Sequence, residues 1–150
     1  RGKFKSSVSI GCLIQNCETG VYGVLNEIKN METVEIALKQ DVEKGPAQII
    51  STIDSEIGPE YFDCMIEKVY YKDESPTQNI VIKITDERLL EKTGGIIQGM
   101  SGSPIIQNGK LAGAVTHVFV NDPTKGYGIF AENMYKTAKK AETSLSSNGK

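Results

Sequence analysis

The 150-residue sequence predicts a mainly β fold in which most strands form a barrel, followed by a C-terminal helix. Three observations lead to this fold class. Short β-branched runs recur at spacings of roughly 8–12 residues, turn dipeptides with glycine or proline separate them, and helical periodicity is scarce. With 39% hydrophobic residues, the chain can bury one core, so a single globular domain is expected.

The predicted strands follow the β-branched runs along the chain. They cover residues 7–14, 21–28, 33–39, 47–53, 61–71, 80–85, 103–107, 110–120 and 127–130. Residues 121–126 (Asn-Asp-Pro-Thr-Lys-Gly) are predicted to be an ordinary turn, because proline fixes φ and glycine closes the turn. A helical turn is expected at 87–91 and a surface helix at 132–143, where Met134, Ala138 and Ala141 form an apolar stripe. Residues 144–150 are a polar tail that is expected to fray.

Composition excludes several function classes. The formal net charge is −2 and the signs are evenly mixed, so nucleic acid is not an expected partner. No apolar run approaches the roughly 18 residues of a membrane span and no signal peptide opens the chain, which is expected to be soluble. Cys12, Cys17 and Cys64 lack a metal-binding spacing, so no disulfide framework, metal or cofactor is expected. Because the chain starts at Arg1, it is expected to be a processed product or an excised piece.

The most informative stretch is residues 99–104, Gly-Met-Ser-Gly-Ser-Pro, followed by two apolar segments joined by Asn108 and Gly109. A serine attacks a carbonyl only if a base takes its proton and donors hold the oxyanion. Gly99 has no Cβ, so its N–H can turn toward the same point as the N–H of Ser101. Ser101 is therefore a candidate nucleophile, with Gly99 and Ser101 as oxyanion donors. The alternative is a Gly-Ser turn before a strand; the Asn-Gly hairpin after it favours a rigidly held loop.

Residues 94–110 (GGIIQGMSGSPIIQNGK) and 114–129 (AVTHVFVNDPTKGYGI) carry a family likeness. They resemble the SpoIVB (stage IV sporulation protein B) serine peptidases, over about 87–134 and more weakly over 45–50 and 17–23. The resemblance implies a chymotrypsin-like fold in which this chain supplies the second barrel plus additional strands. It also implies a peptidase domain over residues 1–143, with 144–150 as the tail.

The resemblance assigns the site residue by residue. Ser101 corresponds to the family's nucleophile, and Asp86 resembles its proposed third catalytic residue. Asp86 also fits a helix N-cap, which we keep as an equal alternative. The family's general base lies in an upstream Gly-His motif that this chain lacks, because its one histidine is His117. With Thr116 and Val115, His117 is expected to line the substrate cleft.

Without that base the chain is expected to be nearly inactive on its own, since removing one member of such a unit costs on the order of 10⁶-fold. The domain is therefore predicted to lack an upstream segment that carries the histidine. This segment is itself an expected partner.

The resemblance implies a serine endopeptidase that acts between the forespore and the mother cell. It would cleave itself and a membrane-bound regulatory protein, which activates intramembrane processing of a sigma-factor precursor. The alternative is a non-catalytic β-barrel that binds a peptide or partner and uses Ser101 only as a turn residue.

Overall fold

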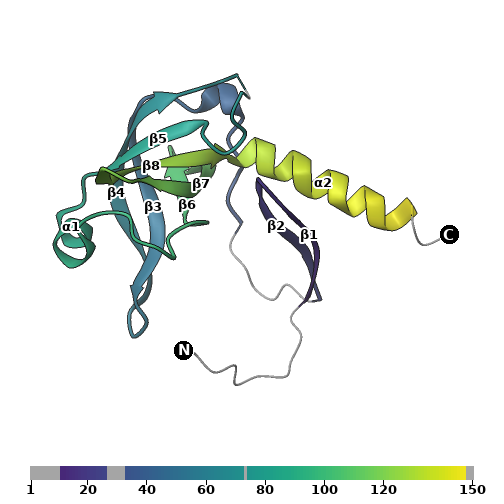
Figure 1. The fold of residues 1–150 in the computed structure, drawn as a ribbon, viewed down its shortest axis with the longest axis horizontal. Coiled ribbons are helices and arrows are strands. Elements are labelled where there is room, and N and C mark those ends of the chain that lie inside the picture. The colour runs from purple at the N-terminus through teal and green to yellow at the C-terminus, as the bar shows by residue number, and fades with distance from the viewer. Residues whose placement is uncertain (1–10, 27–32, 73, 148–150) are drawn as a thin grey trace.

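A computed structural model describes residues 11–26, 33–72 and 74–147. It consists of a closed six-stranded antiparallel barrel, a separate two-stranded hairpin, and a long C-terminal helix that extends away from the barrel (Figure 1). The barrel order is β3-β4-β5-β8-β7-β6. The predicted mainly β class with a barrel and a C-terminal helix is confirmed.

The elements are β1 (Gly11–Cys17), β2 (Gly20–Leu25), η1 (Lys39–Asp41), β3 (Gly45–Asp54), β4 (Gly58–Val69), β5 (Ile80–Ile84), α1 (Glu87–Thr93), β6 (Pro104–Gln107), β7 (Lys110–Phe119), β8 (Asp122–Phe130) and α2 (Ala131–Ser147).

The barrel interior follows from strand alternation. On β4, Phe62, Cys64 and Ile66 are buried whereas Tyr61 and Met65 are exposed. Successive side chains of a strand point to opposite faces, so one face of each strand supplies the core. Isoleucine dominates this core, and the fully buried Ile residues come from five different strands: Ile49, Ile66, Ile80, Ile82, Ile84, Ile105 and Ile129. The interior is therefore filled by side chains, as expected for a small barrel.

Two of the predicted elements are wrong. Residues 33–39 form no strand; Ile36 makes a single parallel bridge to Leu111 before the short helix η1. Residues 121–126 are not a loop, because β8 begins at Asp122. The pairing of β7 with β8 is irregular between Val118 and Phe119, and proline is tolerated at such irregularities. Pro123 also contributes to the fold through its carbonyl oxygen, which accepts a bond from Ile96 N at 2.7 Å.

Other boundaries shift less. The predicted strand 7–14 corresponds to β1, whose described part starts at Gly11, and residues 27 and 28 of the predicted strand 21–28 lie outside the described residues. Helix α2 continues to Ser147, so residues 144–147 are helical rather than part of a tail. Here Ser144 Oγ donates to Lys140 O at 3.0 Å, a bond that is compatible with a helix.

The β1–β2 hairpin does not join the barrel sheet. It lies beside α2 (Figure 1). Ile14 and Tyr22 of the hairpin line a hollow together with Tyr135 and Ala138 of α2. Both helices of the described residues are too short or too polar to cross a membrane. The hairpin is consequently placed by α2 and by the barrel surface, not by pairing with a third strand.

Candidate active site

The loop of residues 99–104, hereafter the serine loop, connects the segment after α1 to β6 and is pinned to β7. Gly102 N donates to Val115 O at 2.8 Å, and Val115 N donates to Ser103 O at 2.9 Å. Gly99 and Gly102 have φ values of 104° and 92°, which residues with a Cβ rarely adopt. The two glycines accept this backbone path, and of the two residues between them Met100 is buried whereas Ser101 is exposed.

The hydroxyl of Ser101 is exposed and makes one hydrogen bond within the described part of the chain. Ser101 Oγ donates to the carbonyl oxygen of Thr116 at 2.8 Å. It is not hydrogen-bonded to His117, although His117 is the next residue on β7. A backbone carbonyl cannot take a proton at neutral pH, so this bond orients the hydroxyl without activating it.

Some backbone N–H groups of the serine loop donate to carbonyl oxygens nearby, and others remain without an acceptor among the described residues. Met100 N donates to Ile97 O, and Ser103 N donates to Met100 O. Among the described residues, the N–H groups of Gly99 and Ser101 donate to no protein acceptor. Unpaired N–H groups of the serine itself and of the residue two positions before it are the donor type that an oxyanion requires.

Two hollows meet at the serine loop, and Ser101 and Gly102 belong to both. The hairpin-side hollow, of about 470 Å³, lies between the loop, β7 and the turn of the β1–β2 hairpin. It includes Val115, Thr116 and His117, the residues expected to line a cleft. The β3-side hollow, of about 410 Å³, opens toward β3 and includes Gly99. A larger hollow of about 550 Å³ beside Tyr70 shares no residue with the serine loop.

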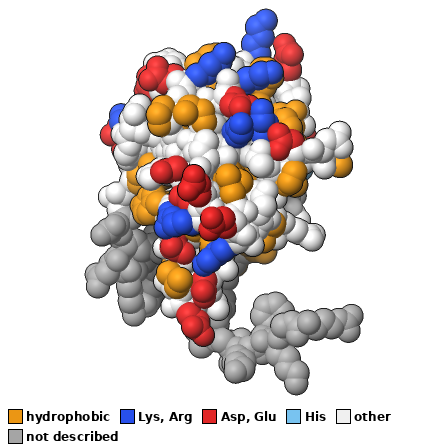
Figure 2. Space-filling view, turned by 90° about the vertical axis from the view of Figure 1, so that its left-hand side faces the viewer, with side chains coloured by type: hydrophobic (Ala, Val, Ile, Leu, Met, Phe, Trp, Pro, Cys, Tyr) orange, Lys and Arg blue, Asp and Glu red, His pale blue; other side chains and the backbone are white. Residues whose placement is uncertain are grey.

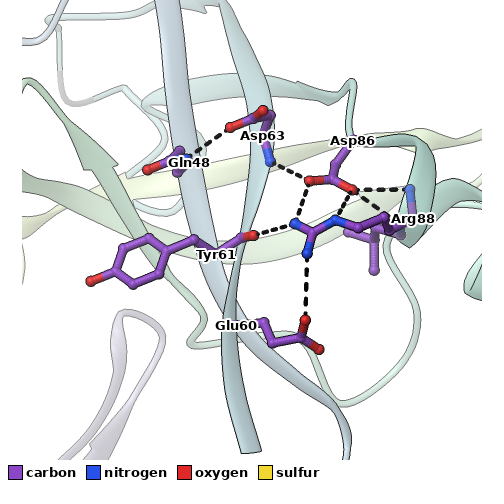
Figure 3. A network of polar contacts seen from close by, with 7 residues as sticks. Gln48, Glu60, Tyr61, Asp63, Asp86 and Arg88 are labelled. Atoms are coloured by element: carbon purple, nitrogen blue, oxygen red, sulfur yellow. Dashed lines mark hydrogen bonds and ion pairs between the residues drawn. The ribbon is translucent and has the colours of Figure 1, made fainter. Parts of the chain in front are cut away.

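Asp86 lies in neither hollow. It is the N-cap of α1, and its Oδ1 accepts from Arg88 N at 3.0 Å and from Leu89 N at 3.4 Å. Its Oδ2 accepts from Asp63 N at 3.1 Å and pairs with the Arg88 guanidinium at 2.9 Å (Figure 3). The hydrogen bonds from Arg88 in particular, aided by the backbone donors, lower the pKa of Asp86. The alternative of a helix cap is thus confirmed, and the catalytic role of Asp86 stays a prediction.

Arg88 extends this cap into a wider polar network. Its guanidinium donates to Tyr61 O at 2.8 Å and approaches Glu60 at 3.5 Å (Figure 3). It also lies 5.2 Å above the ring of Phe62. These contacts fasten α1 to the outside of β4. Over the side of the molecule that carries α1, acidic and basic side chains are interspersed with hydrophobic ones (Figure 2).

A closed antiparallel barrel that presents a serine on a glycine-flanked loop is typical of a serine-peptidase-like domain. The family model described as SpoIVB peptidase S55 matches residues 1–135. The chain belongs to this family.

A solved structure shares the fold. The chain resembles the inactive form of a serine-to-alanine mutant of Rv3671c from M. tuberculosis H37Rv, with a TM-score of 0.60 and 13% identity. The match covers 89% of this chain and 65% of that one, so this chain spans about two thirds of the neighbour's length. No curated protein sequence matches significantly.

Sequence reasoning missed two parts of the site. The carbonyl of Thr116 holds the serine hydroxyl, and backbone acceptors carry no sequence signal. The turn of the β1–β2 hairpin together with the first residues of β2, residues 18–22, forms a wall of the hairpin-side hollow. The weak family likeness over residues 17–23 was the one sequence signal that pointed to this segment.

Proposed function

We propose that Ser101 is the nucleophile of a serine endopeptidase and that this chain, on its own, lacks the general base. The observation that carries the proposal is the exposed Ser101 hydroxyl on a loop pinned to β7, with two unpaired N–H groups beside it. Membership of a peptidase family supports the same chemistry.

The reaction assigns a role to each part of the loop. Ser101 Oγ would bond to the carbonyl carbon of the scissile peptide, and the Gly99 and Ser101 N–H groups would hold the resulting oxyanion. The proton of the hydroxyl must pass to a base. Since the sequence has one histidine and the hydroxyl points to Thr116 O instead, we propose that a preceding segment of the protein supplies a histidine.

The substrate we propose is protein, bound in extended form along residues 115–118. Family membership supports a membrane-bound regulatory protein and the peptidase itself as targets, in the extracytoplasmic space between forespore and mother cell. The outcome of that cleavage would be processing of a sigma-factor precursor. These assignments rest on the family and not on the geometry of the hollows.

Fluorophosphonate labelling in the presence of added imidazole tests the nucleophile, because imidazole can replace a missing histidine base. We expect slow labelling of the chain alone and at least tenfold faster labelling with imidazole. Ser101→Ala should abolish both. Ser55→Ala is the matched control, because Ser55 is an exposed serine that lies outside both hollows, and it should label like the parent chain. Labelling that persists in Ser101→Ala refutes the assignment.

One observation favours a second candidate function, a non-catalytic peptide-binding barrel. The family match covers every residue upstream of Ser101, and none of these residues is histidine. If imidazole and a longer chain both leave Ser101 unlabelled while extended peptides still bind beside it, the binding function replaces the peptidase.

A further inference from the structure

The two hollows that meet at Ser101 differ in chemistry. The hairpin-side hollow is lined mostly by apolar side chains: Val21, Ala114, Val115, Ile129 and Met134. The β3-side hollow carries the hydroxyls of Ser51, Thr52 and Ser103. A peptide that runs from one hollow into the other must cross Ser101, because Ser101 and Gly102 are the residues that the two share.

The hairpin-side hollow is built from three separate elements. Its floor is β7, where Ala114 and Val115 are 5% and 2% exposed. One wall is the first part of α2, through Met134, and the other is the hairpin turn. Val21, the second residue of β2, is 57% exposed, so most of its apolar surface is open within the described part of the chain and can contact a ligand.

The charges around this hollow limit what it can hold. Glu18 is the carboxylate of the lining, and the lining contains no lysine or arginine. An acidic ligand side chain would therefore lose water and meet a like charge, and His117 is the one basic side chain of the lining. An aliphatic or aromatic side chain would instead cover Val21 and Met134, which is favourable.

We propose that the hairpin-side hollow is a specificity subsite for one large apolar side chain of the peptide that lies across Ser101. The β3-side hollow receives a small or hydroxyl-bearing residue on the other side of the scissile bond. This inference rests on the proposed function and names the substrate class of the same site. The hairpin turn is a specificity element, because it forms the subsite wall without taking part in the chemistry.

Binding of two short peptides to the full 150-residue chain tests the subsite, because binding needs no general base. The probes are Ac-Ala-Ala-Leu-Ser-Ser-Ala-NH₂ and its counterpart with aspartate in place of leucine, titrated by methyl NMR up to about 10 mM. We expect the leucine peptide to bind at least tenfold more tightly, a difference of about 1.4 kcal/mol. It should shift the methyl signals of Val21, Ile129 and Met134.

Two variants localise the effect. Met134→Lys should weaken the leucine peptide at least tenfold and leave the aspartate peptide unchanged or slightly stronger. Met65→Lys is the matched control, because Met65 is exposed on β4 and lies outside the hollow. It should bind both peptides like the parent chain, and unfolding of each variant in urea checks that it is folded.

Several results overturn the subsite. They are no binding of the leucine peptide, equal affinity for the two peptides, shifts confined to other regions, and an equal loss in Met65→Lys. The proposed function fails separately, in the labelling experiment. A chain that labels at Ser101 but does not distinguish the peptides refutes the subsite alone, and one that distinguishes them without labelling refutes the nucleophile alone.

Discussion

The barrel and the β1–β2 hairpin are built from similar β-branched sequence but bury their apolar side chains very differently. In the barrel, Ile49, Phe62 and Ile82 are fully buried. In the hairpin, Leu13 is 78% exposed and Val21 57%. Closure gives each barrel strand two neighbours and an enclosed interior, whereas a two-stranded sheet is marginal on its own and has no interior.

This difference divides the site between a stable and a less stable part. The serine loop is bonded to β7, so the Ser101 hydroxyl is held by the barrel. The hairpin turn contributes a wall of the hairpin-side hollow without joining the barrel sheet. Segments with few buried contacts unfold locally at a low free-energy cost, so the hairpin turn is expected to open more readily than the serine loop.

The largest effect should come from the barrel core. Phe62→Ala removes a fully buried ring that also lies under the Arg88 guanidinium. We expect the free energy of unfolding to fall by about 3–5 kcal/mol, from lost apolar burial and the cavity that remains. Urea unfolding followed by circular dichroism measures this change. A loss below about 1 kcal/mol would contradict a tightly packed barrel interior.

An intermediate effect is expected at Asp86, on the outer surface of the barrel. Asp86→Ala leaves the α1 cap and Asp63 N without their acceptor, and should cost about 1–3 kcal/mol of unfolding free energy. Asp86→Asn keeps an acceptor and should cost less. If Asp86 acts only as the cap, neither variant changes the imidazole-dependent labelling of Ser101 in the folded protein. A folded Asp86→Asn that loses labelling would support the catalytic assignment.

The same residue predicts a pH dependence. Arg88 and the backbone donors lower the pKa of Asp86 in the folded chain below its unfolded value of about 3.9. The ionised carboxylate therefore stabilises the fold above about pH 4, and this contribution is lost as the pH falls through the lowered pKa. We expect the stability difference between the parent chain and Asp86→Asn to be constant from pH 7 to 5 and to shrink below pH 4. A difference that grows on acidification would contradict this.

The smallest effect should come from the hairpin. Leu13→Ser changes a side chain that is already mostly in water, so unfolding free energy should change by no more than about 0.5 kcal/mol. The loss of unfolding free energy in Leu13→Ser is compared with the loss in Phe62→Ala, which measures how differently the hairpin and the barrel contribute to stability. A loss comparable to that of Phe62→Ala would mean that the hairpin belongs to the cooperative unit of the barrel.

Local sequence signals correctly predicted the turn between β6 and β7 and the cap of α1. The Asn-Gly dipeptide forms the predicted tight turn between β6 and β7, with φ of 52° at Asn108 and 75° at Gly109. The cap alternative for Asp86 rested on the sequence after it and is confirmed. Such signals succeed because the hydrogen bonds and dihedral angles concerned lie within a few residues of each other.

The two wrong elements show where local signals fail. Asp122 and Pro123 have ordinary turn chemistry, yet the long partner strand β7 and the bond from Ile96 N to Pro123 O draw them into β8. Residues 33–39 have strand-like alternation but find no strand partner beyond the bridge at Ile36. Strand pairing is a property of two distant segments, so propensity in one of them cannot decide it.

The sequence by itself determined the mainly β class, the glycine-flanked serine loop and the family resemblance, because alternation, turn chemistry and motif are all local. It also determined that His117 is the one histidine. Only the tertiary structure decided that the Ser101 hydroxyl bonds to Thr116 O, that Asp86 accepts a bond from Asp63 N, and that the hairpin turn lies beside the serine loop. The physical reason is that each of these contacts joins groups on different elements, and closing the barrel and docking the hairpin bring them together.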